Sequence, residues 1–374
     1  MDNCLISWAE IDLRAIRSNI AGIKRLISPQ TKLMAVVKAN AYGHGMVEVS
    51  KACLQEGASY LGVANPDEAV ALREAGINAQ VLLLGYMPEE CAETMVQNQI
   101  EVTVFNLDTA KVLSKAASSS DGEARLHLKI DTGMGRIGFN PDSSSLELIS
   151  EISRLPGIFI QGIFSHLATA DHSDKSFARQ QVEIFKRFIC KLEESGVSIP
   201  LKHIANSAAI MEMPEAHFNM VRSGITTYGL YPSPQVDKAK LDLTPAMRLK
   251  SRVSYVKTIP QGQSVSYGRT YISEHETRVA TVSIGYADGY SRLLSNRGWA
   301  TIRGKKVPLI GTVCMDQCMF DVSGLENVQV GDEIILFGRP EDGVTADDLA
   351  DTIGTINYEI VCAPSSRVNR IYMG

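Results

Sequence analysis

The chain has 374 residues, of which 45% are hydrophobic, so it is long enough for two domains or for one barrel-sized domain and a smaller one. Its formal net charge of −5 gives no attraction to nucleic acid and no polybasic patch for a membrane surface. We therefore expect its partners to be small molecules or other protein chains.

The amino-terminus and the cysteines predict a reduced, soluble, cytoplasmic protein. MDNCLISWAEIDL carries acids where a signal peptide needs basic and then apolar segments, and no uncharged apolar stretch of about 18 residues follows. Seven cysteines are scattered along the chain. Cys314 and Cys318 in CMDQC have no second Cys or His pair nearby, so we expect no metal site.

Eight short apolar runs, each followed by an amphipathic segment, organise the first two thirds of the chain. They are LMAVV at 33, YLGVA at 60, VLLLG at 81, VTVF at 102, RLHLKI at 125, FIQGIFS at 159, KHIAN at 202 and NMVRSG at 219. Eightfold strand–helix alternation predicts a (β/α)8 TIM barrel. The alternative is a doubly wound open sheet, which usually carries a GxGxxG after a strand, and none is present.

After Leu230 the pattern changes to a Pro-punctuated linker and then to strands without long helices, such as MRLKSRVSYVKTI, RVATVSIGY and DEIILFG. This texture predicts a C-terminal, mostly β domain. We place the barrel at residues 1–235 and the β domain at 236–374. The short run at 5–13 either joins the β domain or precedes the barrel.

The ends of the predicted barrel strands, where barrel active sites lie, carry cations, hydroxyls and backbone amides that suit an anionic ligand. They are Lys38 and Tyr42, Lys129 and Arg136, His166, Ser207, and Arg222 with Gly224 and Ile225. Each also has an ordinary interpretation: a solvated strand-end lysine, a core histidine, or structural ion-pair arginines. A lysine among apolar neighbours can instead form a Schiff base, and the loops after strands seven and eight often bind phosphate. Together these features point to pyridoxal 5'-phosphate.

AVVKANAYGHG resembles the cofactor-lysine signature of the alanine racemase family. The resemblance continues through KIDTGMGRIGF, FSHLATAD, ANSAA, VRSGITTYGLYP, VSYGRTY, IGYADGY, GTVCMDQCMFDV and NYEIVCAPSSRVNRIY. It implies a barrel followed by a β domain, and a homodimer with active sites at the subunit interface. It also implies interconversion of L- and D-alanine, supplying D-alanine for peptidoglycan in the cell wall.

The same resemblance implies a role for each site residue. Lys38 binds the cofactor and takes the Cα proton of D-alanine, while Tyr267 of the partner subunit takes that of L-alanine. An ordinary tyrosine has a pKa near about 10, so the positive charge of Arg222, relayed by His166, would favour the phenolate. The remaining roles are cofactor binding (Tyr42, His166, Ser207, Arg222, Gly224, Ile225, Tyr358), substrate binding (Arg136, Met315, Asp316), the substrate gate (Tyr286, Tyr358) and carbamylation (Lys129).

Three other functions remain open at this point. Another racemase on this scaffold would act on serine or a broader set of amino acids. A decarboxylase of the same architecture would need no second base on the far face, which Tyr267 provides. A non-catalytic carrier of the cofactor would need no β domain.

Overall fold

A computed structural model describes residues 5–374. Contacts within the chain divide it into two compact units. Of the described residues, one unit contains 16–41 and 46–243, and the other contains 5–15, 42–45 and 244–374. In the described part of the chain, no helix is long and apolar enough to cross a membrane.

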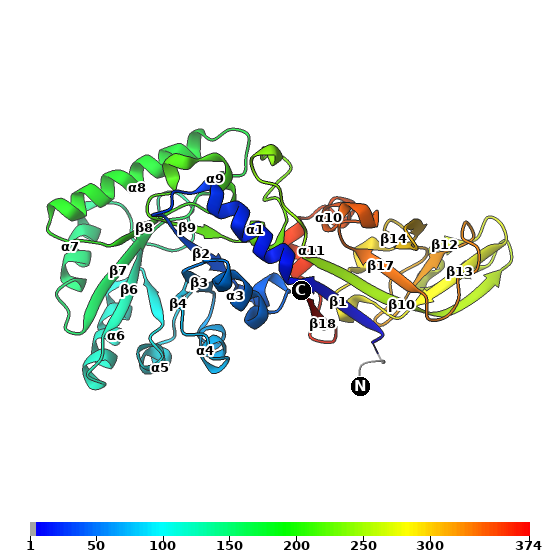
Figure 1. Ribbon diagram of the computed structural model, residues 1–374, viewed down its shortest axis with the longest axis horizontal. Helices are drawn as coiled ribbons and strands as arrows, with labels where there is room; N and C mark the ends of the chain where they lie inside the picture. Colours follow the sequence, from blue (N-terminus) through cyan, green and yellow to red (C-terminus); the bar gives the residue numbers. More distant parts are fainter. Residues whose placement is uncertain (1–4) are drawn as a thin grey trace. The chain divides into compact units, whose positions relative to one another are not determined.

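The first unit is an eight-stranded parallel sheet with helices on its outer side (Figure 1). The strands follow one another in the order β8-β7-β6-β5-β4-β3-β2-β9, and a hydrogen bond of 3.1 Å from Arg222 N–H to the Ala205 carbonyl joins the two ends of this order. The strands are β2 (Lys32–Val36), β3 (Tyr60–Val63), β4 (Gln80–Leu83), β5 (Glu101–Val104), β6 (Ala124–Lys129), β7 (Ile158–Phe164), β8 (Leu201–His203) and β9 (Met220–Ser223). The predicted TIM barrel is therefore confirmed.

Helices cover the outer side of this sheet, and short polar side chains cap several of them. The helices are α1 (Leu13–Leu26), α3 (Met46–Gln55), α4 (Pro66–Glu74), α5 (Ala92–Gln97), α6 (Leu107–Ser119), α7 (Ser143–Ile152), α8 (Ser176–Glu194) and α9 (Ser207–Glu212). Asn65, Asn106, Asp142 and Asn206 each accept a backbone N–H in the first turn of the next helix. These caps end the loops that follow β3, β5, β6 and β8 and help to fix where the side chains of those loops lie.

Apolar side chains fill much of the barrel interior, because parallel strands covered on both faces are largely buried. All residues of β3, β5 and β9 are buried. Met34, Tyr60, Leu82, Leu201 and Met220 form one cluster between the strands.

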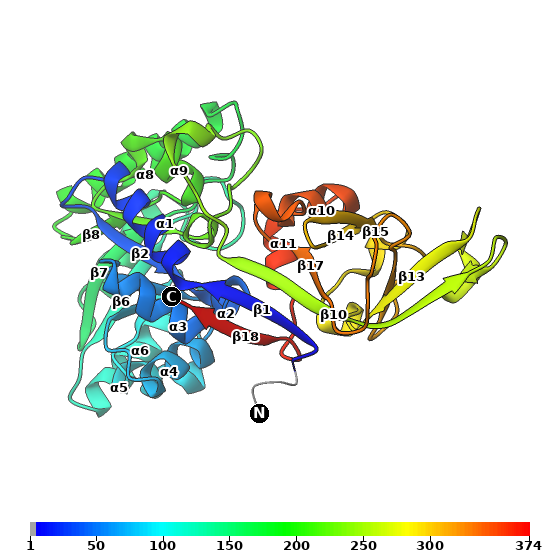
Figure 2. The same ribbon diagram turned by 45° about the vertical axis from the view of Figure 1, so that its right-hand side comes forward.

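The second unit is built on an eight-stranded sheet in which β1 (Ser7–Asp12) lies between β10 (Met247–Ile259) and β18 (Asn369–Met373) (Figure 2). β1 pairs antiparallel with β10 and parallel with β18. The other strands are β13 (Thr277–Val282), β14 (Trp299–Ile302), β15 (Lys305–Pro308), β16 (Cys318–Asp321) and β17 (Glu333–Phe337), with a separate hairpin of β11 (Ser264–Val265) and β12 (Tyr271–Ile272). The mostly β second domain is therefore confirmed.

Two short helices, α10 (Ala346–Ile353) and α11 (Asn357–Cys362), interrupt this unit. Thr345 and Asp348 form a capping box at the start of α10, and Gly354 ends it with φ of 76°. The sequence carries this signal, Thr-x-x-Asp followed by glycine, although the strand-rich texture around it predicts no long helix.

Candidate active site

Lys38 begins a left-handed turn at the end of the first barrel strand. The turn, α2 (Lys38–Tyr42) in Figure 2, has φ of 53° at Ala39, Asn40 and Ala41, and φ of 51° at Tyr42. Left-handed backbone costs about 1–2 kcal/mol at each L-residue other than glycine, so surrounding contacts must hold it. Strain of this kind is concentrated at functional sites.

Hydrogen bonds from two side chains hold the turn. The Glu68 carboxylate accepts Ala39 N–H at 2.6 Å and Ala64 N–H at 2.8 Å. The Asn40 side chain accepts the N–H of Met46, the first residue of α3, at 2.9 Å. These hydrogen bonds therefore fix the backbone of the turn that carries Lys38, which is half-buried.

Arg222 is buried in the barrel. Its Nη2 donates to the Ser165 carbonyl at 2.9 Å and to His166 Nδ1 at 3.2 Å, and its Nη1 donates to His203 Nδ1 at 2.9 Å. Burial, and then the charge of Arg136, lower the pKa of Arg222 to about 9. The guanidinium is therefore still charged at neutral pH.

His166 is a neutral imidazole among cations. Burial and the charges of Arg222, Arg136, Lys129 and Lys38 lower its pKa well below the ordinary value. Because Arg222 donates to Nδ1, the hydrogen of the neutral ring lies on Nε2. Of these cations, Arg222 contacts the ring directly, with its Nη2 at 3.2 Å from Nδ1.

Lys129 lies beneath the loop that carries Arg136. Its ammonium donates to the carbonyls of Ile130 at 2.8 Å and Ile137 at 3.1 Å. Burial lowers its pKa to about 8, against the opposing charge of Asp131 and together with the charges of Arg222 and Arg136. Asp131 accepts the N–H groups of the three residues 133–135 and so fixes the turn that leads to Arg136.

Ser207 and Gly224 meet on the neighbouring strand ends. The Ser207 hydroxyl, at the start of α9, accepts Gly224 N–H at 2.9 Å and the Thr226 hydroxyl at 3.0 Å. Ile225 follows in the turn η3 (Ile225–Tyr228). A hydroxyl and backbone amides thus lie together where the sequence predicts phosphate binding.

Tyr267 lies in the second unit on a turn of unusual backbone. Its neighbours Ser266, Gly268 and Arg269 have φ of 67°, 73° and 49°. Thr312 donates to the Tyr267 carbonyl at 2.9 Å, while the Tyr267 side chain is 71% exposed. The protein thus holds the backbone of this tyrosine and leaves its ring outward.

Tyr286, Met315 and Asp316 come together near the same part of the second unit. Tyr286 N–H donates to the Cys314 carbonyl at 3.1 Å, and Ala287 N–H donates to the Met315 carbonyl at 3.0 Å. Arg367 joins this pair of loops, because its guanidinium contacts Asp316 at 2.8 Å and Asp288 at 3.2 Å. Met315 and Tyr286 are exposed.

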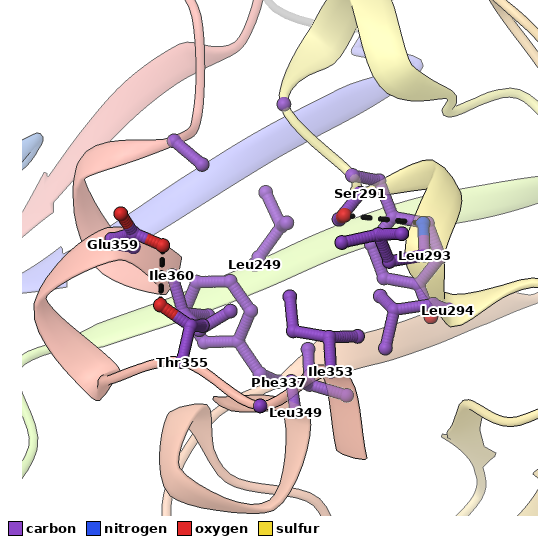
Figure 3. A pocket seen from close by; sticks show the side chains of 14 residues that line it. Leu249, Ser291, Leu293, Leu294, Phe337, Leu349, Ile353, Thr355, Glu359 and Ile360 are labelled. Carbon is purple, nitrogen blue, oxygen red and sulfur yellow. Dashed lines mark hydrogen bonds between the residues drawn. The ribbon is translucent and has the colours of Figure 1, made fainter. Parts of the chain in front are cut away.

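Tyr358, on α11, packs against Tyr42, with 6.1 Å between ring centroids and an interplanar angle of 48°. Burial and the nearby Cys362 raise the pKa of Tyr42, so its phenol stays protonated and can donate a hydrogen bond. The other side of α11 lines an apolar cavity of about 380 Å³, between Leu249, Phe337 and Ile360 (Figure 3). No residue predicted from the sequence lines this cavity.

Several residues of these sites are absent from the sequence-based prediction. Glu68 looks like an ordinary acid in the first turn of a helix. Glu101, His127 and His203 are polar residues in apolar strand segments. Because buried polar groups need partners, this contrast could have marked them as members of a buried polar network. Nothing in the sequence around Arg367 marked it as a site residue.

The chain matches the family model for the alanine racemase N-terminal domain over residues 11–232 and that for the alanine racemase C-terminal domain over residues 246–372. It is 48% identical to the alanine racemase of Methanococcus maripaludis over 367 residues, which are 98% of each chain.

Two solved structures extend the likeness to three dimensions. The alanine racemase of Clostridium difficile 630 superposes with a TM-score of 0.95 at 44% identity, over 99% of this chain and 96% of the other. The alanine racemase of Bacillus anthracis with bound L-Ala-P has a TM-score of 0.94 at 37% identity, over 100% and 96%. The chain therefore belongs to the alanine racemase family and is an amino-acid racemase, an isomerase.

Proposed function

We propose that the enzyme interconverts L- and D-alanine by a two-base mechanism with pyridoxal 5'-phosphate. The observation that carries this proposal is the arrangement at the strand ends, where the buried Arg222 donates to His166 Nδ1 at 3.2 Å and the Ser207 hydroxyl accepts Gly224 N–H at 2.9 Å. Family membership supports alanine as the substrate. The B. anthracis alanine racemase, whose structure holds bound L-Ala-P, supports it as well.

The residues at the strand ends fit the cofactor by their chemistry. Lys38 has the amine that an aldehyde requires, and the hydroxyl of Ser207 with the amides of Gly224 and Ile225 suits a phosphate. Tyr42 and Tyr358 would complete the phosphate contacts, and Arg222 and His166 would hold the pyridine ring. When bound, pyridoxal phosphate acts as an electron sink that acidifies the Cα–H of the amino acid.

Racemisation removes a proton from one face of Cα and returns one to the other, so it needs two bases on opposite sides. Lys38 takes the proton from D-alanine and returns it there. Tyr267 does the same for L-alanine. The hydrogen on His166 Nε2 donates to the Tyr267 oxygen, and the Arg222 charge behind it stabilises the phenolate form.

The remaining residues hold and select the substrate. Arg136 pairs with the substrate carboxylate, and Lys129, as ammonium or as carbamate, braces the loop that presents Arg136. Met315 and Asp316 border the substrate, and the phenol rings of Tyr286 and Tyr358 narrow the entrance so that a methyl side chain is preferred.

We infer a homodimer in which Tyr267, Met315 and Asp316 serve the active site of the partner subunit. The exposure of Tyr267 at 71% and of Met315 at 53% supports this, because large apolar side chains gathered on a surface mark interaction sites. Supply of D-alanine for peptidoglycan and a cytoplasmic location stay predictions.

The first test is incubation with L-alanine in deuterated water, with L-serine and L-lysine alongside. For L-alanine we expect loss of optical rotation together with deuterium incorporation at Cα, which proton NMR would measure. The same changes should be smaller for L-serine. Exchange without loss of rotation would mean that one face works, and the role of Tyr267 would be wrong. Turnover of lysine without alanine would point to another amino-acid specificity.

Variants then assign the two bases. Lys38→Ala should abolish turnover, and Tyr267→Phe should lower kcat by about 10²–10⁴, the usual contribution of one acid–base group. Tyr255→Phe is the control, because Tyr255 is an exposed tyrosine on β10 outside the site. Equal losses for Tyr267→Phe and Tyr255→Phe would contradict the assignment.

A further inference from the structure

A chain of four buried polar side chains crosses the barrel interior. Arg222 on β9 contacts His203 on β8 (Nη1 to Nδ1, 2.9 Å), His203 contacts His127 on β6 (Nε2 to Nδ1, 3.0 Å), and His127 contacts Glu101 on β5 (Nε2 to Oε2, 2.6 Å). All four are at most 4% exposed. This chain connects the Arg222 guanidinium at the mouth of the barrel to the Glu101 carboxylate on β5.

The hydrogen bonds of this chain can run in only one direction. Arginine is a donor only, so His203 Nδ1 accepts and His203 Nε2 carries the hydrogen. Burial and the Arg222 charge lower the pKa of His203 well below its ordinary value, which keeps the ring neutral. His203 Nε2–H then donates to His127 Nδ1, and His127 Nε2–H donates to Glu101.

A second chain ends on the same carboxylate. Gln161 Nε2 donates to the Tyr60 hydroxyl at 3.4 Å, and Tyr60 donates to Glu101 Oε1 at 3.3 Å. Burial and the Glu101 charge raise the pKa of Tyr60, so its phenol keeps its proton. Both Glu101 oxygens therefore accept hydrogen bonds, Oε2 from His127 and Oε1 from Tyr60, an arrangement that suits a carboxylate.

Glu101 also matters for the charge of the barrel interior. Among the described residues of this unit, it is the one carboxylate that is fully buried, whereas Lys129 and Arg222 are buried cations. A buried charge needs a partner or a chain of oriented dipoles that leads to one. The two neutral histidine rings, aligned from Arg222 to Glu101, provide that chain.

We propose that Glu101 is a positioning residue for Arg222. Its carboxylate fixes His127 and His203 in one tautomer, and His203 in turn holds the Arg222 guanidinium in place beside His166. The inference rests on the proposed role of Arg222 toward the cofactor and adds a residue at the far side of the barrel to that role.

The first measurement uses the cofactor-free protein with ¹⁵N-labelled histidine. We expect the wild-type rings of His127 and His203 to be neutral with hydrogen on Nε2. Glu101→Gln keeps an oxygen acceptor of the same reach but removes the charge, so the His127 Nε2–H resonance should move upfield and exchange faster. Rings with hydrogen on Nδ1, or resonances that Glu101→Gln leaves unchanged, would overturn the proposal.

The second measurement uses the holoenzyme. Glu101→Gln should lower kcat for alanine by about tenfold in both directions, the effect expected from losing one charged hydrogen bond. KM for alanine should be unchanged, because Arg136 binds the carboxylate, and the absorption maximum of the bound cofactor should shift. A wild-type kcat and spectrum in this variant would overturn the proposal.

Thr103→Val is the matched control. Thr103 lies two residues further along β5 and is buried, and its hydroxyl makes no hydrogen bond with any residue in the described part of the chain. Valine should therefore leave kcat and the histidine spectra as they are. A loss of kcat in Thr103→Val equal to that in Glu101→Gln would show a packing effect and overturn the role of the charge. If the wild type does not racemise alanine at all, the proposed function fails, and the histidine spectra still decide the role of Glu101.

Discussion

Lys129 shows how burial prepares a single side chain for chemistry. An ordinary lysine is almost wholly protonated at neutral pH, whereas burial brings the pKa of Lys129 to about 8. A neutral amine attacks CO2, forms an N–C bond and releases a proton to solvent. Two backbone carbonyls already fix its nitrogen.

We predict carbamate formation at Lys129. In ¹³C-bicarbonate, a carbamate signal should appear and grow from about pH 7 to 9, because the share of neutral amine rises through the pKa. Lys129→Gln should remove the signal by NMR, and Lys51→Gln, at an exposed lysine, should keep it. A signal that survives Lys129→Gln would place the carbamate elsewhere.

The lowered pKa of His166 makes the free energy of unfolding depend on pH. Its pKa in the folded protein is below the value of an unfolded histidine, so the unfolded chain binds more protons as the pH falls below about 6.5. This contribution to stability is present above that pH and is lost on acidification, at up to about 1.4 kcal/mol for each pH unit.

His166→Gln should therefore flatten the decline in the free energy of unfolding between about pH 6.5 and 5, as measured with urea. Glutamine still offers Arg222 an acceptor. His275→Gln, at an exposed position of the second unit, should decline like the wild type. An unaltered slope in His166→Gln would show that this ring is not held neutral.

At the scale of elements, the left-handed turn after β2 is the most unusual segment. Ala39 is exposed and has φ of 53°, a conformation that glycine adopts without steric cost. Ala39→Gly should raise the free energy of unfolding by about 0.5–1 kcal/mol, the relieved strain minus the added chain entropy.

Ala71→Gly is the control for this turn, because Ala71 lies inside α4. There glycine should lower stability by about 0.5–1 kcal/mol. Thermal unfolding of both variants would show the opposite signs. A loss of stability in Ala39→Gly would mean that the entropy of the turn outweighs its strain.

The strands were predictable from the sequence, whereas several details of the site were not. Most barrel strands are largely apolar, because both their faces are covered, and turn residues bound them. Lys38, Arg136 and Arg222 follow from their places at strand ends. The roles of Tyr267 and Met315 rest on family resemblance, because an exposed tyrosine or methionine carries no signal of its own.

The turn at Lys38 and the histidine chain could not be predicted from the sequence, for physical reasons. Residues such as Ala39 and Ala41 give no hint of positive φ, since tertiary contacts with Glu68 impose it. One partner of His127 is His203 on β8, 76 residues further along the chain, and no sequence pattern pairs the two rings.

At the scale of the whole molecule, the proposed dimer makes each site from two chains. Lys38→Ala and Tyr267→Phe should each be nearly inactive alone. After their subunits are mixed and exchanged, half of the dimers contain both variants and one of their two sites is intact. We predict recovery of about a quarter of wild-type activity.

The control is a mixture of Lys38→Ala with the double variant Lys38→Ala, Tyr267→Phe, which should stay inactive. Sedimentation would show whether dimers form and exchange. No recovery despite exchange would mean that Lys38 and Tyr267 of one chain act together.

The parallel pairing of β1 with β18 sets an order of events during synthesis. Proteins fold from the amino-terminus as they leave the ribosome, so the barrel strands emerge long before residue 369. β1 is made first among the strands, yet its parallel neighbour is made last. The second unit can therefore be completed only after residues 369–373 have left the ribosome, and deletion of β18 should delay maturation far more than its length suggests.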